Sequence, residues 1–349
     1  MTGFHWQMNR AGLALLVLVL GGSIADAQSD RVFPKEGRTL TGAISKVSAK
    51  GITIESGGRE VEVPATEIKM VNFGTESREI TTARRAISEE RLNNALQILE
   101  SIDSGQLDPP ALALDVDYLT AYCIVKMALS GERGTLDQAT GVLTDFLEKG
   151  GESYHYTNAV ELLGDLLLAR GVYDQAEAQY QRLVSTPWPD VQQIGRLKVG
   201  RMQELQGKYS DALKNYQAVQ QVESTTAESR QSKLEAQVGQ ARCQAFGGDF
   251  ESGIATLNQM IVEESSTNGR LFGQIYNALG NCYVAAKQPK QAINAFLHTD
   301  LLFYQDPEQH AEALYRLGEL FNSMSKFEES AEAREKLKSR YGTSPWAKK

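Results

Sequence analysis

Apolar and polar positions along residues 78–349 alternate with the spacing of amphipathic helices, and from about residue 157 the pattern repeats as a unit. In each unit a small residue is followed twelve positions later by another small residue, usually with an aromatic residue between them. The five pairs are Gly164 with Ala176, Gly200 with Ala212, Ala241 with Gly253, Gly280 with Ala292, and Gly318 with Ser330. Their first members lie 36, 41, 39 and 38 residues apart, so the pattern predicts five successive helical hairpins.

The small residues are expected where the two helices of a hairpin cross, because a larger side chain there would hold the backbones apart. Turns such as Arg170-Gly171 and Gly247-Gly248 supply the left-handed residue that ends a helix. In four units a bulky apolar residue follows the second small residue by four positions, which extends the buried stripe of the second helix. These residues are Tyr180, Tyr216, Leu257 and Phe296.

The repeated residues resemble the tetratricopeptide repeat (TPR). That family combines a Leu-Gly pair, a Gly-x-Tyr-x-x-Ala run and a later aromatic residue, and the first clear unit here has Leu163-Gly164, the run over residues 171–176, and Tyr180. The resemblance covers residues 157–349 as five degenerate units and implies a mainly α fold, an α-solenoid of helical hairpins. The family period is 34 residues, whereas every spacing here is longer, which predicts longer helices or joints.

Residues 31–75 have a different pattern, with short alternating runs separated by turns that contain Gly. Four or five strands in so short a stretch predict a small antiparallel β module ahead of the solenoid. Its rhythm resembles Sm-like and SH3-like small barrels, and Sm-like barrels often bind RNA. The segment has 7 basic against 5 acidic residues and two aromatic residues, Phe33 and Phe73, which disfavours a base-stacking surface.

Residues 78–150 are expected to form one or two divergent repeats that cap the array.

The first 27 residues have the features of a secretory signal peptide. Arg10 precedes an unbroken apolar run over residues 11–20, and Ala25-Asp26-Ala27 offers a cleavage site. Ten apolar residues are too few to span about 30 Å of hydrocarbon as a helix, so cleavage is favoured over retention as an anchor. We therefore expect export to the periplasm or another envelope space, with no integral membrane segment left after cleavage.

Composition and motifs argue against nucleic-acid binding, metal binding and catalysis. The net charge of −8 disfavours a general nucleic-acid surface, so no nucleic-acid partner is expected. The 4 His form no metal-binding motif, and nucleophile-elbow, Walker A and dinucleotide fingerprints do not occur, so we predict no metal, no cofactor and no catalysis. Cys243 and Cys282 hold equivalent positions on successive units, about 8–10 Å apart, which is too far for a disulfide and predicts buried free thiols.

The resemblance also implies where a partner binds. In the tetratricopeptide family the first helix of each unit lines a concave groove, at positions six and three before the small residue and one, four and five after it. The candidates are Glu161, Asp165, Leu197, Arg201, Arg242, Phe246, Asn277, Asn281, Tyr315 and Glu319. Arg201, Arg242 and Asn281 occupy one position in consecutive units, a polar ladder suited to an acidic segment or a terminal carboxylate. The favoured alternative is a solvated surface without specificity.

Three functions fit the sequence. We favour a non-catalytic scaffold of the cell envelope that binds a protein or extended peptide in the groove, with self-association left open. The second is an accessory protein of envelope or outer-membrane assembly of the Tol-Pal-associated type, because residues 313–345 resemble the terminal repeats of such proteins, although those families lack this β module. The third is RNA binding through the Sm-like module, which the charge count disfavours.

Overall fold

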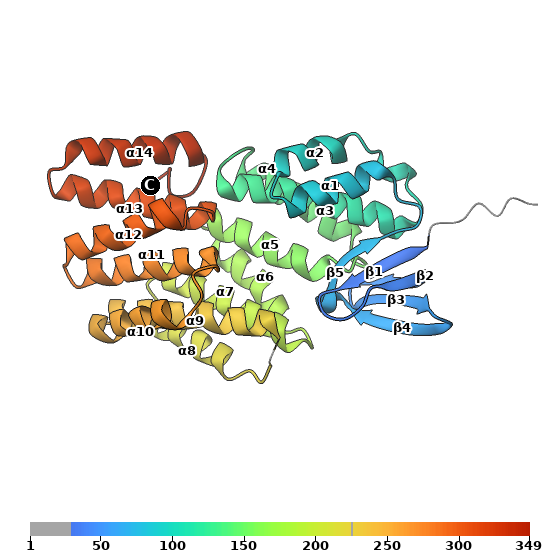
Figure 1. The fold of residues 1–349 in the computed structure, drawn as a ribbon, viewed down its shortest axis with the longest axis horizontal. Helices are drawn as coiled ribbons and strands as arrows, with labels where there is room; N and C mark the ends of the chain where they lie inside the picture. Colours follow the sequence, from blue (N-terminus) through green and yellow to red (C-terminus); the bar gives the residue numbers. More distant parts are fainter. Residues whose placement is uncertain (1–28, 225) are drawn as a thin grey trace, which may run out of the picture.

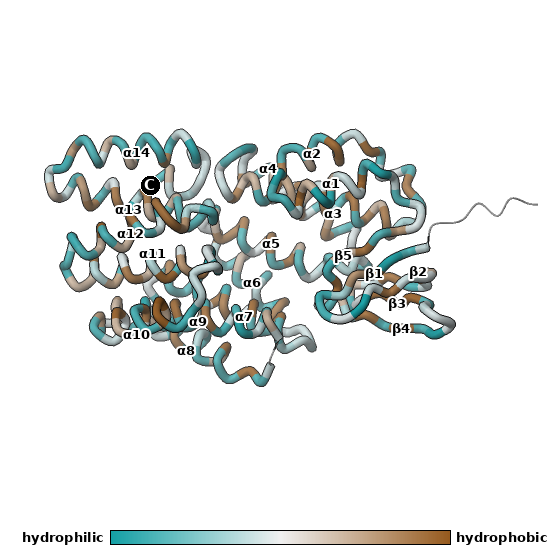
Figure 2. The backbone as a smooth tube through the Cα atoms, viewed as in Figure 1, coloured by the Kyte–Doolittle hydropathy of each residue, from teal (hydrophilic) through white to brown (hydrophobic). Residues whose placement is uncertain are grey.

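The computed structural model describes residues 29–224 and 226–349 (Figure 1). Within these residues, fourteen α-helices paired as hairpins follow a five-stranded antiparallel sheet, which confirms the predicted mainly α class. Apolar and polar residues alternate along the helices, as expected where amphipathic helices share a core (Figure 2). The predicted signal peptide, residues 1–27, lies outside the described residues.

The N-terminal sheet has the strand order β4-β3-β2-β1-β5, and all paired strands are antiparallel. The strands are β1 (Asp30–Pro34), β2 (Leu40–Ser48), β3 (Gly51–Ser56), β4 (Arg59–Pro64) and β5 (Ile68–Asn72). The turn between β2 and β3 depends on Gly51, because φ is +150° and a Cβ there would lie 2.2 Å from the Val63 carbonyl oxygen. This glycine fixes the position of Ala49 and Lys50 at the end of the sheet.

Seven helical hairpins follow, each made of two consecutive helices in close contact. The helices are α1 (Arg78–Ser88), α2 (Leu92–Glu100), α3 (Pro110–Ser130), α4 (Leu136–Lys149), α5 (Tyr156–Ala169), α6 (Tyr173–Val184), α7 (Pro189–Leu205), α8 (Tyr209–Gln220), α9 (Ala227–Phe246), α10 (Phe250–Glu263), α11 (Gly269–Ala285), α12 (Pro289–Leu302), α13 (Pro307–Ser323) and α14 (Phe327–Tyr341). The hairpins from α5 to α14 contain the five small-residue pairs, and α1 to α4 supply two more hairpins ahead of them.

Glycines and aromatic rings hold neighbouring helices close together. The ring of Tyr216 on α8 lies against Gly200 on α7 and Gly239 on α9, where a Cβ would lie 2.8 and 2.4 Å from ring carbons. Gly164 on α5 faces the ring of Tyr180 on α6 in the same way. Both tyrosines are at most 1% exposed, which confirms that the small residue makes room for the bulky residue of the second helix.

The sheet and the first hairpins share one hydrophobic core. Val32 and Ile54 of the sheet belong to the same buried cluster as Ile80 of α1, Leu96 of α2 and Leu112 of α3. The apolar face of the sheet is therefore covered by the start of the helical array. The sheet is fixed against the array by burial of this shared core.

The last hairpin packs back against α3. Helix α13 contacts α3, and the chain after α14 meets Gly131 at the end of α3. Gly131 has φ +80°, and a Cβ there would lie 2.7 Å from the Ser344 nitrogen and 3.1 Å from the Tyr341 carbonyl oxygen. Figure 1 shows the α13–α14 hairpin beside the α3–α4 hairpin. The first helices of successive hairpins, from α3 to α13, therefore form a layer that closes on itself.

The cysteines are buried and unpaired, as predicted for Cys243 and Cys282. The Cys282 thiol on α11 lies 3.9 Å from the Ala241 carbonyl oxygen on α9. Burial raises the pKa of this thiol to about 12. The Cys282 side chain fills the contact between α9 and α11 and is a poor nucleophile there.

Candidate interaction surface

The ten residues predicted to line a groove lie on the first helices of the last five hairpins, namely α5, α7, α9, α11 and α13. Their exposure differs. Asn277 and Asn281 are 1% and 5% exposed, whereas Phe246 and Glu319 lie at the surface and the other six are half-buried. The partners of the polar side chains decide what this layer is able to bind.

Glu204 on α7 accepts hydrogen bonds from both arginines of the predicted ladder. Arg242 on α9 donates from Nε to Oε1 over 2.6 Å and from Nη2 to Oε2 over 3.0 Å. Arg201 donates from Nη1 to Oε1 over 2.9 Å, and the hydroxyl of Tyr216 donates to Oε2 over 2.9 Å. Burial alone would raise the pKa of Glu204, but Arg242 and Arg201 outweigh it and hold that pKa below its usual value. Both arginines thus share one internal carboxylate, which leaves one net positive charge on this group of three residues.

The two acidic candidates on α5 are also paired internally. Lys198 on α7 lies 2.7 Å from Asp165 Oδ2 and 3.2 Å from Glu161 Oε1. The hydroxyl of Tyr180 donates to Asp165 Oδ1 over 2.9 Å. Burial would lower the pKa of Lys198, but Asp165 and Glu161 outweigh it and raise that pKa. The ammonium group stays charged between two carboxylates.

The two asparagines on α11 face α13. Asn277 donates from Nδ2 to the Gln309 carbonyl oxygen over 2.8 Å, and Asn281 donates from Nδ2 to Glu312 Oε1 over 3.0 Å. Gln309 and Glu312 are themselves at most 9% exposed. These buried amides therefore join the fourth and fifth of these hairpins, because a buried polar group is costly unless it is hydrogen-bonded.

These contacts form what we call the inter-repeat ladder: Asp165–Lys198, Glu204–Arg242 and Asn281–Glu312. It joins α5 to α7, α7 to α9 and α11 to α13. The sequence offered a ladder for an acidic partner at Arg201, Arg242 and Asn281 and favoured a solvated surface there. In the structure these side chains donate hydrogen bonds to Glu204 and Glu312 within the chain. An acidic segment would have to displace Glu204, an internal carboxylate already at hydrogen-bond distance from Arg242.

The remaining candidates make local contacts. The ring of Phe246 stacks on Tyr209, with centroids 5.2 Å apart and planes 13° apart. Tyr315 lies 5.6 Å from the ring of Trp346, and Glu319 lies 3.5 Å from Arg316. Leu197 packs against the buried cluster that holds Tyr216. Among these, Phe246 presents the largest exposed apolar surface.

Three apolar side chains are exposed in the last turns of successive first helices. Leu205, Phe246 and Val284 lie in the last turns of α7, α9 and α11 and are 44%, 38% and 39% exposed. Contacts join α7 to α9 and α9 to α11, so the three side chains follow one edge of the array. We call them the apolar row. Counted from the small residue, Leu205 and Phe246 lie five positions on and Val284 lies four positions on. The groove count included all three, but the candidate set retained only Phe246.

A buried ionic cluster lies outside the predicted groove, and sequence reasoning missed it. Asp115 on α3 is 0% exposed and lies 2.7 Å from Arg84 of α1 and 2.8 Å from His155, which precedes α5. The Tyr154 hydroxyl donates to the same carboxylate. This cluster joins three elements in the interior. Among the described residues, no group of three or more His, Cys, Asp or Glu side chains has the geometry of a metal site.

Solved structures with the same fold are helical repeat proteins. A tetratricopeptide repeat protein from Parabacteroides merdae aligns with a TM-score of 0.51 and 16% identity over 75% of this chain and 91% of its own. RapI aligns at 0.53 and 11% identity over 75% of this chain and 98% of its own. A Rap protein bound to the competence and sporulation factor aligns at 0.53 and 10% identity over 75% and 73%. The chain therefore has a tetratricopeptide-type repeat fold.

No protein-family model matches the chain, and neither does any curated protein. In residues 29–224 and 226–349, no helix has the length and apolar character needed to cross a membrane.

Proposed function

We propose that the chain is an exported, non-catalytic scaffold that binds a protein partner along the apolar row. The observation that carries this proposal is the exposure of Leu205, Phe246 and Val284 in the last turns of three successive first helices. Apolar side chains exposed next to one another on successive repeats are a typical feature of an interaction surface. The fold supports it, since an array of this kind in a Rap protein is bound to the competence and sporulation factor.

The spacing of the row suits an extended segment. Neighbouring packed helices lie about 8–10 Å apart, and a polyproline II segment advances about 3.1 Å per residue with three residues per turn. Every third side chain of such a segment points to the same side, so apolar side chains at every third position would meet Leu205, Phe246 and Val284 in turn. Arg201 lies one turn before Leu205, and its side chain is 24% exposed. An acidic residue in the partner peptide is therefore favoured next to the apolar residue that meets Leu205.

Export is supported by the N-terminal sequence. Arg10, the apolar run over residues 11–20 and the triplet at residues 25–27 have the order of a cleaved signal peptide. The partner is then a protein of the periplasm or cell envelope. Fractionation of cells followed by N-terminal sequencing of the protein tests this part: a mature chain that begins at Gln28 in the envelope fraction supports it, and an intact N-terminus in the cytoplasm contradicts it.

The binding site is tested by comparative capture from native envelope extracts. We expect the proteins retained by the wild-type chain to be lost from a Leu205→Glu, Phe246→Glu double variant, because two charges would then replace the exposed apolar contacts. Val262→Glu is the matched control, since Val262 on α10 is 85% exposed and outside the row. Equal retention by all three proteins would place the partner elsewhere on the molecule.

A further inference from the structure

A small open cleft lies where the sheet meets the helical array. The β2–β3 turn contributes Ala49 and Lys50, α5 contributes Tyr156 and Val160, and α6 contributes Arg182. The cleft holds about 190 Å³. It brings together residues more than 100 positions apart in the sequence, and neither the apolar row nor the inter-repeat ladder includes any of them.

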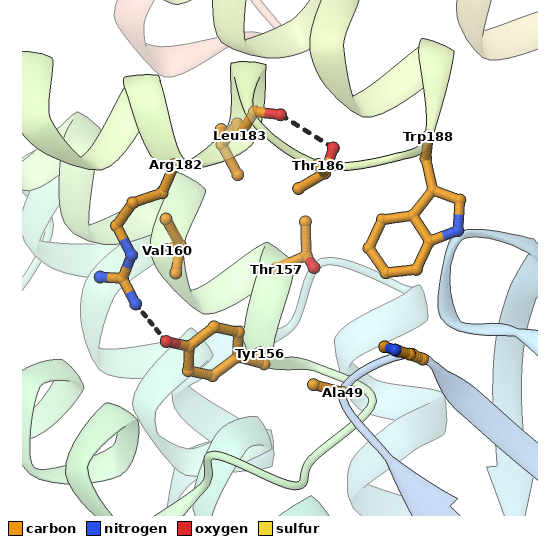
Figure 3. A pocket seen from close by; sticks show the side chains of 9 residues that line it. Ala49, Tyr156, Thr157, Val160, Arg182, Leu183, Thr186 and Trp188 are labelled. Carbon is orange, nitrogen blue, oxygen red and sulfur yellow. Dashed lines mark hydrogen bonds between the residues drawn. The ribbon is translucent and has the colours of Figure 1, made fainter.

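Apolar and aromatic surfaces form the walls of this cleft. Val160 is buried, and the rings of Tyr156 and Trp188 are half-buried. Figure 3 shows Arg182 and Trp188 at opposite ends of the cleft, with Val160 and Thr157 between them. The two rings leave an apolar slot that opens to solvent. Such a slot favours a bulky apolar side chain.

Two cationic side chains flank the slot. The Arg182 guanidinium lies 5.3 Å from the centre of the Tyr156 ring and donates to the Tyr156 hydroxyl and, over 2.6 Å, to Gln179 Oε1. Both hydrogen-bond acceptors are neutral. Among the ion pairs of the described residues none includes Arg182 or Lys50, and both side chains are exposed. Their charges are therefore available to an anion, unlike those of Arg242 and Lys198.

We propose that this cleft binds the C-terminal residue of a peptide, with its apolar side chain between Tyr156 and Trp188, its carboxylate at Arg182, and Lys50 as a second, longer-range positive charge. A C-terminal residue carries a carboxylate and an apolar side chain on the same Cα, which matches a slot with cations at its rim. The volume is below the roughly 300–1,000 Å³ typical of whole small-molecule sites, which favours one residue over a cofactor. The inference rests on the proposed function only in taking the ligand to be a polypeptide.

The probe for this site is the dipeptide N-acetyl-Leu-Phe, as the free acid and as the C-terminal amide, titrated into the full chain. Trp188 is the reporter, and its signal is isolated by subtracting the fluorescence of Trp188→Phe. We expect the free acid to bind about tenfold more tightly than the amide, because the amide lacks the charge that Arg182 and Lys50 attract. Arg182→Gln should weaken binding of the acid about tenfold, and Arg182→Lys, which keeps the charge, should weaken it less.

Lys50→Gln should also weaken binding of the acid. Lys46→Gln is its matched control, because Lys46 lies exposed on β2, just before the turn that carries Lys50, and does not line the cleft. Equal affinity for acid and amide, or an Arg182→Gln chain that binds the acid as well as wild type does, would overturn the proposal.

Decanoate, a fatty acid with a carboxylate and an apolar chain, tests whether the cleft binds a lipid instead. Decanoate that binds more tightly than the dipeptide and loses affinity in Arg182→Gln would overturn the peptide assignment in favour of a fatty acid. The Leu205→Glu, Phe246→Glu variant should bind the probe normally, so failure at the apolar row and failure at the cleft are distinguishable.

Discussion

Arg242 donates two hydrogen bonds, over 2.6 and 3.0 Å, to Glu204 on the preceding repeat. The arginine is 13% exposed and the carboxylate 5%, so the pair is largely removed from water. The sequence left Arg242 as either a partner contact or a solvated residue, and the structure shows that it joins α9 to α7. Any experiment that reverses its charge therefore tests stability before it tests binding.

We expect Arg242→Ala to lower the free energy of unfolding by about 1–3 kcal/mol, because buried Glu204 loses two charge-assisted hydrogen bonds and keeps those from Arg201 and Tyr216. Arg230→Ala is the matched control: Arg230 is 75% exposed, pairs with Glu264 over 3.4 Å and should cost less than about 1 kcal/mol. Denaturant unfolding followed by circular dichroism measures both. Equal losses of stability for the two variants would show that the Glu204–Arg242 pair contributes no more than an exposed ion pair does.

Two helical glycines should respond to alanine in opposite directions. Gly239→Ala places a Cβ 2.4 Å from the Tyr216 ring, and the overpacking should cost about 1–3 kcal/mol beyond the gain in helix propensity. Gly141→Ala on α4 meets nothing within 4 Å and should stabilise by up to about 1 kcal/mol. Thermal unfolding of both variants is the measurement. A stabilising Gly239→Ala would mean that α8 and α9 separate easily.

The contact between the last hairpin and α3 should depend on Gly131. Gly131→Ala combines a left-handed backbone, φ +80°, with a clash at Ser344, whereas Gly171→Ala has a similar φ of +76° with open space around it. Backbone strain alone costs about 1–2 kcal/mol, so Gly131→Ala should cost more than Gly171→Ala. Hydrogen exchange should also show faster opening of residues 341–349 in Gly131→Ala only. Unchanged protection there would argue against closure of the array at this point.

Acid should weaken the fold in two steps through the Asp115 cluster. Burial lowers the pKa of His155 despite the hydrogen bond to Asp115, so this stability is present above the unfolded pKa, about 6.5, and is lost as the pH falls. Burial alone would raise the pKa of Asp115, but Arg84 and His155 outweigh it and lower that pKa, so a second loss follows below about pH 4. Urea unfolding at pH 7, 5 and 3.5 measures both steps. His155→Gln should remove the loss between pH 7 and 5, and a loss that persists in this variant would assign the first step to another group.

The thiols should react only after unfolding. Burial raises the pKa of Cys123 to about 11, and burial first and Glu204 second raise the pKa of Cys243 to about 12. At pH 8 almost none of either group is thiolate, which is the reactive form. A disulfide reagent such as DTNB should therefore label the native chain slowly and the chain in guanidinium at once. Rapid labelling of the native chain would show that these helices open frequently.

Repeat architecture was predictable from the sequence because its determinants are local. The spacing from Gly164 to Tyr180 is set by the geometry of one hairpin. The ring of Tyr180 packs only where the facing residue has no Cβ, so the glycine and the aromatic residue recur together in the sequence. The same logic located the first helices and so the positions of Arg201 and Arg242. The exposure of Phe246 also follows from its place in the last turn of a first helix.

The partners of these residues were not predictable, since they depend on how whole elements are placed. Glu204 lies four residues after Gly200, and in the sequence it resembles any other solvated carboxylate. In the structure, α9 places Arg242 beside it. Lys50 and Arg182 are separated by most of three hairpins and meet at one cleft only because the sheet shares its core with α1 to α3. The sequence by itself determined the hairpins, their number in the clear repeat region and the stripe that each buries, because helix periodicity and steric fit act over short distances. Tertiary structure alone decided which charged side chains form ion pairs within the chain and which remain unpaired for a ligand. Ion pairing depends on distances between helices, and only the packed array sets these distances.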